Sequence, residues 1–211
     1  MSNLILILGR SGTGKTSSLR NLTSADVNVI SATGKPMPFK SDIKVYKPPT
    51  IESVIPTIDK TVAPIVVIDD ANYFLSFYKG KHLMDSNPYA APKYIAHWFT
   101  SLMEHIIDRD TDQNFYILAH TEVDDSGARV FKTTGKFVRD DLVPEGLTNI
   151  IVESFIEDGE YKFATKPLDD NSPVKTPIGM IKESTMSNDL KELDASIRGF
   201  YGDTKSSKGE K

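Results

Sequence analysis

The sequence predicts a single α/β domain in which helices flank a mostly parallel sheet, with a β-hairpin added near the C-terminus. Apolar residues recur every three or four positions across residues 95–106, which indicates an amphipathic helix. Two strand-like runs at 150–156 and 161–165 are joined by Glu-Asp-Gly-Glu, a hairpin signal. Continuous apolar runs, typical of buried parallel strands, occur at residues 4–8, 64–68 and 115–119.

The first half of the chain alternates strands and helices. Thr50 is the expected N-cap of a short helix, with Glu52 in its first turn. The elements expected here are, in order, a strand at 4–8, a helix at 17–22, strands at 27–31 and 43–46, a helix at 50–59, a strand at 64–68, an aromatic-rich stretch at 72–78 and a loop at 80–92.

The second half begins with the amphipathic helix, whose Trp98 and Phe99 are expected in the core because of their helical spacing. After it we expect a strand at 115–119, the hairpin, a loop at 171–179, a helix at about 188–198 and a disordered tail at 204–211. Residues 1–200 are then one domain, with a core at 3–122 and a hairpin extension at about 128–180.

Composition limits the classes of function. The 211-residue chain has a formal net charge of −4 and no cysteine. Without a global basic field, nucleic-acid contact needs a local patch or added subunits. Without cysteine, disulfides, thiol catalysis and thiolate metal sites are excluded. No apolar run approaches the ~20 residues of a membrane helix, and the start lacks a basic signal region, so we expect a cytoplasmic protein without membrane contact.

Between the first strand and the first helix, residues 9–16 read Gly-Arg-Ser-Gly-Thr-Gly-Lys-Thr, which fits the phosphate-binding pattern G-x-x-x-x-G-K-[ST]. Its glycines let backbone N–H groups close around a polyphosphate. Lys15 supplies a charge to the β- and γ-phosphates, and the Thr16 hydroxyl ligates Mg²⁺. The residues expected to contact the nucleotide are Gly9, Arg10, Ser11, Gly12, Thr13, Gly14, Lys15, Thr16 and Ser17.

The apolar strand that ends in Asp69 and Asp70 supplies the second element of such a site. Asp69 is expected to hold Mg²⁺ through water, together with Thr16. Asp70 either orients the attacking water or caps the following turn.

His120 and Glu122 follow the strand at 115–119, at the sheet edge where ligands bind in open α/β folds. His120 is a candidate sensor of the γ-phosphate and Glu122 a candidate general base. The alternative is that His120 bonds a loop and Glu122 is solvated. With Lys15 and Asp70, these two residues complete the candidate catalytic set.

A basic cluster of Arg129, Lys132, Lys136 and Arg139 follows. It is either a loop that binds a DNA strand, the source of a cationic side chain (a finger) that reaches a neighbouring subunit's nucleotide, or a solvated hairpin face. Lys166 and Lys175 are further finger candidates. The aromatic residues at 73, 74, 77 and 78 follow Asp70 directly and are expected beneath the site or at a subunit contact.

Three segments together carry a family resemblance: residues 9–16, residues 66–70 (Val-Val-Ile-Asp-Asp) and residues 117–122 (Ile-Leu-Ala-His-Thr-Glu). They resemble the small phage-encoded P-loop ATPases with a RecA-like core, some of which anneal or recombine single-stranded DNA. Residues 161–165 and 175–180 are similar to that group's ending. The resemblance implies use of ATP with Mg²⁺, single-stranded DNA as partner, homo-oligomeric rings or filaments, and the host cytoplasm as location.

The chain departs from this pattern at the catalytic glutamate, which RecA-like enzymes carry after the strand preceding the metal-binding one. Here that strand is followed by Lys47-Pro48-Pro49, and the nearest acid is Glu52. The base therefore stays open between Asp70, Glu122 and Glu52.

The leading hypothesis is an ATPase with slow or DNA-stimulated hydrolysis in recombination, annealing or replication. The alternatives are a nucleotide-binding partner protein without turnover and a small-molecule kinase, although the scattered arginines do not suggest a kinase lid. A GTPase switch is a weaker reading, because residues 165–168 lack the acid that reads guanine.

Overall fold

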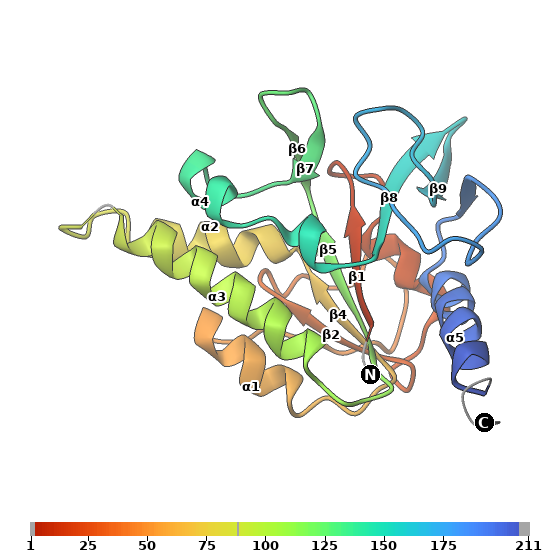
Figure 1. The fold of residues 1–211 in the computed structure, drawn as a ribbon. Coiled ribbons are helices and arrows are strands. Elements are labelled where there is room, and N and C mark those ends of the chain that lie inside the picture. The colour runs from red at the N-terminus through yellow and green to blue at the C-terminus, as the bar shows by residue number, and fades with distance from the viewer. Residues whose placement is uncertain (1–2, 88, 207–211) are drawn as a thin grey trace.

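A computed structural model describes residues 3–87 and 89–206, which form an α/β fold (Figure 1). The strands are β1 (Asn3–Leu8), β2 (Val27–Ser31), β3 (Val45–Tyr46), β4 (Ile65–Asp69), β5 (Asn114–Ala119), β6 (Thr121–Val123), β7 (Arg129–Phe131), β8 (Ile150–Glu157), β9 (Glu160–Ala164) and β10 (Thr185–Ser187). The helices are η1 (Thr16–Asn21), η2 (Ile51–Ser53), α1 (Val54–Ile58), α2 (Ala71–Lys81), α3 (Ala90–Ile107), α4 (Lys136–Asp141), η3 (Pro144–Leu147) and α5 (Leu190–Ser206), where η marks a 3₁₀-helix.

Eight strands form one sheet in the order β10-β9-β8-β1-β5-β4-β2-β3. The pairs from β8 through β3 are parallel, whereas β8, β9 and β10 pair in antiparallel fashion. The predicted α/β fold with a mostly parallel sheet is therefore confirmed. Strands β6 and β7 form a separate hairpin that projects from the sheet edge (Figure 1).

Both faces of the sheet are buried, because alternate side chains of each strand point to opposite sides. Leu4, Leu6 and Leu8 belong to one apolar cluster together with α1, α2 and α3. Ile5 and Ile7 belong to the other, with η1 and α5 (Figure 1). Continuous apolar strands are what this two-sided burial requires. Among the described residues, no helix is long and apolar enough to cross a membrane.

The strands were the best predicted elements. The strands expected at 4–8, 27–31, 64–68 and 115–119 and both hairpin strands are present within one or two residues, and Trp98 and Phe99 are buried as expected. The hairpin predicted as an extension of a core at residues 3–122 is part of the main sheet. Its strand β8 pairs in parallel with β1, so β8 and β9 continue the main sheet.

The helices needed more correction. The expected helix at 17–22 is the 3₁₀-helix η1, and the expected helix at 50–59 is split into η2 and α1. Thr50 occupies the N-cap position, but its side chain makes no capping hydrogen bond. The helix α2 was missed, and it takes in part of the loop expected at 80–92. Helix α5 runs to Ser206, so residues 204–206 are helical rather than disordered, and the rest of that expected tail lies outside the described residues.

Candidate functional site

The carboxyl ends of β1, β5 and β4 meet at one edge of the sheet. Leu8 pairs with Ala119, and Ile68 pairs with Ile117. Residues 9–16, the glycine-rich loop, therefore lie beside His120 and the Asp69–Asp70 pair. A cavity of about 330 Å³ opens there, lined by Ser11, Gly12, Gly14, Lys15, Thr16, Ser17, Lys35, Pro36, Pro38, Asp69, Asp70, Tyr73, His120 and Tyr161.

The backbone of the glycine-rich loop needs two of its glycines. Gly12 and Gly14 have φ values of +81° and +93°, which side-chain-bearing residues rarely adopt. A Cβ on Gly14 would also lie 2.7 Å from Cδ1 of Tyr161. Thr13 holds the loop from outside, because its hydroxyl donates to the carbonyl of Arg10 (2.8 Å) and shares a hydrogen bond with the Ser154 hydroxyl (2.7 Å).

Six of the nine residues predicted to contact the nucleotide line this cavity. The other three, Gly9, Arg10 and Thr13, do not. Gly9 and Arg10 instead present carbonyl groups to Lys15, and Thr13 fixes the loop against β8. Their contact with a nucleotide stays a prediction.

Lys15 is almost fully buried inside the loop. Its Nζ donates to the carbonyls of Gly9 and Arg10, both at 2.8 Å, and lies 3.3 Å from Nδ1 of His120. Burial lowers the pKa of Lys15 from 10.5 to about 8, although the carboxylates of Asp70 and Asp69 oppose this shift. The hydrogen bonds and the two nearby carboxylates thus do not fully replace the hydration that the Lys15 ammonium loses on burial.

Thr16 and Asp69 meet as the motif predicts. The Thr16 hydroxyl donates to Oδ1 of Asp69 at 3.0 Å, although 53 residues separate the two in sequence. Burial, and then the neighbouring Asp70 carboxylate, raise the pKa of Asp69 to about 6. A hydroxyl and a carboxylate oxygen suit Mg²⁺, which takes its remaining ligands from phosphates and water. Within the described residues, no three His, Cys, Asp or Glu side chains gather into a metal site of their own.

Asp70 has left-handed backbone angles (φ 56°, ψ 42°), which is uncommon for a residue other than glycine. It stands at the N-cap position of α2, but its side chain makes no capping hydrogen bond. Its Oδ1 instead lies 3.7 Å from Nε2 of His120, and the Thr33 hydroxyl lies 3.5 Å from its Oδ2. Strained residues of this kind are often found at functional sites.

His120 lies between Lys15 and Asp70. Its two ring nitrogens face Lys15 Nζ and Asp70 Oδ1, an arrangement that suits a neutral ring with its proton on Nε2. Burial, followed by the charge of Lys15, lowers the pKa of His120. The backbone N–H of His120 donates to Oδ1 of Asn72 at 2.6 Å, which fixes the end of β5 against α2.

The two glutamates considered as the base lie elsewhere. Glu122 is on β6 outside the cavity, where it accepts weak hydrogen bonds from Thr133 (3.4 Å) and faces Arg139 (3.7 Å). Glu52 accepts a hydrogen bond from the Tyr94 hydroxyl at 2.8 Å. Asp70 is consequently the candidate base that the fold places beside Lys15.

In the basic cluster both arginines are ion-paired, whereas Lys132 is exposed. Arg129 pairs with Glu153 (2.8 Å) and Asp169 (3.1 Å), and Arg139 with Glu122 and Asp125. Lys136 begins the short helix α4, and its side chain is outside the described part. The amines of Lys166 and Lys175 donate to carbonyls of Lys182 and Glu145.

Sequence reasoning missed three contributors to the site: Asn72, Lys35 and Tyr161. Lys35 lies over the Tyr73 ring, 5.9 Å from its centroid, and lines the cavity. Tyr161 reaches the cavity from β9, far from the glycine-rich loop in sequence. No motif marks any of them, because their place depends on how the sheet is assembled.

Comparisons with known proteins add no family. No protein-family model matches the chain, and no curated protein matches it.

Proposed function

We propose that this protein binds Mg-ATP at the glycine-rich loop and hydrolyses it, as a P-loop ATPase with a RecA-like core. The observation that carries the proposal is the hydrogen bond between Thr16 and Asp69 beside the buried Lys15. It joins the two halves of the expected nucleotide site, which lie far apart in sequence. The strand order around β1 is compatible with such a core.

Each side chain has a role that follows from its position. Backbone N–H groups of the loop and the Lys15 ammonium bind the phosphates. Thr16 and Asp69 would hold Mg²⁺, which neutralises charge on the phosphate oxygens when bound. Asp70 accepts the proton of the attacking water or orients it. His120, whose ring nitrogens face Lys15 and Asp70, fixes the positions of these two side chains relative to each other.

The charge that develops in phosphoryl transfer needs further cations. Among the described residues that line the cavity, the cations are Lys15 and Lys35, and none is an arginine. We therefore propose that a neighbouring copy in a homo-oligomer completes the site. Single-stranded DNA is proposed as the macromolecular partner that stimulates turnover.

A second candidate is a nucleotide-binding partner protein that does not turn ATP over. The position of Glu122 and Glu52 away from the loop favours it, because it leaves a single strained aspartate as base.

Turnover separates the two. We expect phosphate release from Mg-ATP to rise when single-stranded DNA is added, and to be lost in Lys15→Ala. Lys60→Ala, an exposed lysine after α1, is the matched control. If the wild-type chain binds Mg-ATP but releases phosphate no faster than Lys15→Ala with or without DNA, the ATPase proposal is refuted and the partner protein is favoured.

A further inference from the structure

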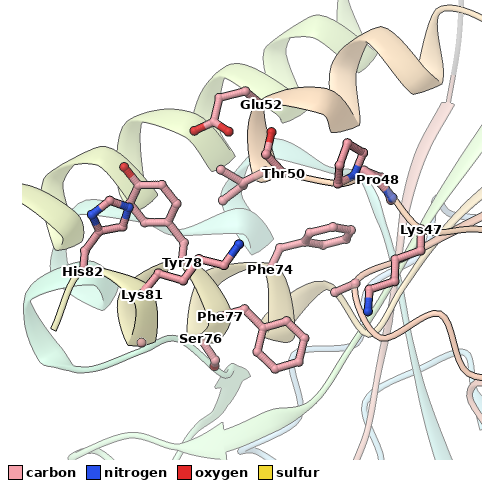
Figure 2. A pocket seen from close by; sticks show the side chains of 14 residues that line it. Lys47, Pro48, Thr50, Glu52, Phe74, Ser76, Phe77, Tyr78, Lys81 and His82 are labelled. Atoms are coloured by element: carbon pink, nitrogen blue, oxygen red, sulfur yellow. The ribbon is translucent and has the colours of Figure 1, made fainter.

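A second cavity, of about 650 Å³, lies between α2 and the segment at residues 47–52. Figure 2 shows side chains of α2 on one side and those of Pro48, Thr50 and Glu52 on the other. We call it the α2 groove. None of its lining residues belongs to the glycine-rich loop or the Asp69–Asp70 pair.

Three aromatic side chains of α2 line the groove: Phe74, Phe77 and Tyr78. Phe74 is buried against Trp98, with 6.0 Å between the ring centroids, and forms a fixed apolar floor. Tyr78 stacks on Tyr94 at 4.6 Å and 14° between the rings, so its orientation is also fixed. Phe77 is 47% exposed. The groove therefore offers an open ring face above a rigid floor, which suits a planar aromatic ligand.

The charge around the groove favours an anion. Lys47 and Lys81 line it, and no ion pair is recorded for either among the described side chains. Glu52 is the single acid in the lining, and it already accepts a hydrogen bond from Tyr94. The Glu52 charge interacts with Lys81, and two lysines against one carboxylate leave the lining a formal excess of one positive charge.

The groove lacks what a free nucleoside triphosphate needs. Gly80 is its single glycine, and it does not have a positive φ. The lining does pair one hydroxyl with a carboxylate, Thr50 with Glu52, but Glu52 is exposed, whereas Asp69 is buried beside Lys15. A strand of DNA, in contrast, presents one phosphate charge per base, which matches an exposed ring with one or two lysines.

From this combination we infer that the α2 groove binds a nucleotide unit of single-stranded DNA, with its base on Phe77 and its phosphate at Lys81 and Lys47. The inference names the contact surface for the DNA partner and so rests on the proposed function.

Helix α2 links this groove to the ATP site. It begins directly after Asp70, and its Tyr73 meets the His120 ring edge-on, with 6.1 Å between centroids. Phe77 in turn lies 5.5 Å from Tyr73 between ring centroids. A nucleobase stacked on Phe77 therefore contacts the helix that begins directly after Asp70, which offers a physical route for DNA to stimulate turnover.

The test measures binding of a fluorescent oligothymidylate by anisotropy, and of Mg-ATP by calorimetry, on the full chain. We expect Phe77→Ala to weaken oligonucleotide binding by about 5- to 100-fold, the range for losing one stacked base. Lys81→Ala should weaken it and lower the salt dependence by about one unit of slope. Both variants should bind Mg-ATP like the wild type, and Lys60→Ala should match the wild type in both assays.

Three results would overturn the inference. One is unchanged oligonucleotide affinity in both groove variants. Another is competition by thymidine monophosphate as strong as that of the oligonucleotide, which would assign the groove to a free nucleotide. The third is a change in particle mass in Phe77→Ala without a change in oligonucleotide affinity, which would assign it to a protein interface. If the wild type binds oligonucleotide through the groove but not Mg-ATP, the inference is supported and the proposed ATPase function fails.

Discussion

The buried Lys15 ammonium should give the protein an unusual dependence of stability on pH. Its pKa is about 8 in the folded chain and near 10.5 in the unfolded chain. Between these values the unfolded state binds more protons, so the free energy of unfolding should rise with pH. A fall from 10.5 to about 8 corresponds to about 3 kcal/mol at 1.36 kcal/mol per pKa unit.

Lys15→Met removes the titrating group and should remove this rise. At pH 7 relief of the buried charge acts against loss of the hydrogen bonds to Gly9 and Arg10, each worth roughly 1.5–3 kcal/mol, so the sign of the change at a single pH says little about the titration. The difference between the two pH profiles is therefore the informative quantity. It should change by about 3 kcal/mol between pH 8 and 10.5.

Urea unfolding at a series of pH values measures this directly. Trp98 is the one tryptophan of the chain and is buried, so its fluorescence reports the loss of the core. Lys60→Met, at an exposed position, should run parallel to the wild type. If Lys15→Met also runs parallel to the wild type, Lys15 titrates as a solvated lysine and is not held inside the loop.

Because bound phosphate favours the ammonium form of Lys15, Mg-ATP affinity should also fall as the pH rises through 8.

Three further predictions concern the nucleobase contact, the catalytic base and the stability of the fold. Tyr161→Ala should weaken ATP binding about tenfold but leave inorganic tripolyphosphate binding unchanged in calorimetry, because the ring borders the phosphate cavity and offers a face for the nucleobase. Asp70→Asn should lower ATP turnover at least about 100-fold while ATP affinity is retained. Asp194→Ala should lower the free energy of unfolding in urea by about 3 kcal/mol, because it leaves the buried Tyr116 hydroxyl and the Arg198 guanidinium without their carboxylate.

Controls sharpen each of these predictions. Tyr161→Phe should bind ATP like the wild type, and an equal loss of tripolyphosphate binding in Tyr161→Ala would mean that the loop itself has been disturbed. Loss of ATP affinity in Asp70→Asn would reassign Asp70 to the metal. Lys191→Ala, exposed on the same helix as Asp194, should leave stability unchanged. An Asp194→Ala chain as stable as that control would contradict the role of the buried network.

The strands could be predicted because two-sided burial leaves continuous apolar runs in the sequence. The helices carried weaker signals. Residues 16–21 are rich in Ser and Thr, which compete with the helical backbone, and they form a 3₁₀-helix. Helix α2 was missed because its aromatic residues are not confined to one buried face. Phe74 enters the core, whereas Phe77 faces the α2 groove and Tyr73 the phosphate cavity.

Only the site residues that a sequence motif marks could be predicted. Lys15, Thr16 and Asp69 are marked by fixed spacing or by the end of an apolar strand, and the structure brings them together. Glu122 was expected there because it follows β5, but the chain turns into the β6–β7 hairpin after His120 and carries Glu122 away. Tyr161 could not be foreseen, because its approach to Gly14 depends on β9 extending the same sheet.

Calorimetric titration of the wild-type chain with Mg-ATP tests the central claim most directly. We expect heat from one site per chain, with affinity that depends on Mg²⁺, is abolished in Lys15→Ala and is reduced in Thr16→Ala, while Lys60→Ala behaves like the wild type. A wild-type chain that gives no heat with either Mg-ATP or Mg-GTP would contradict the account.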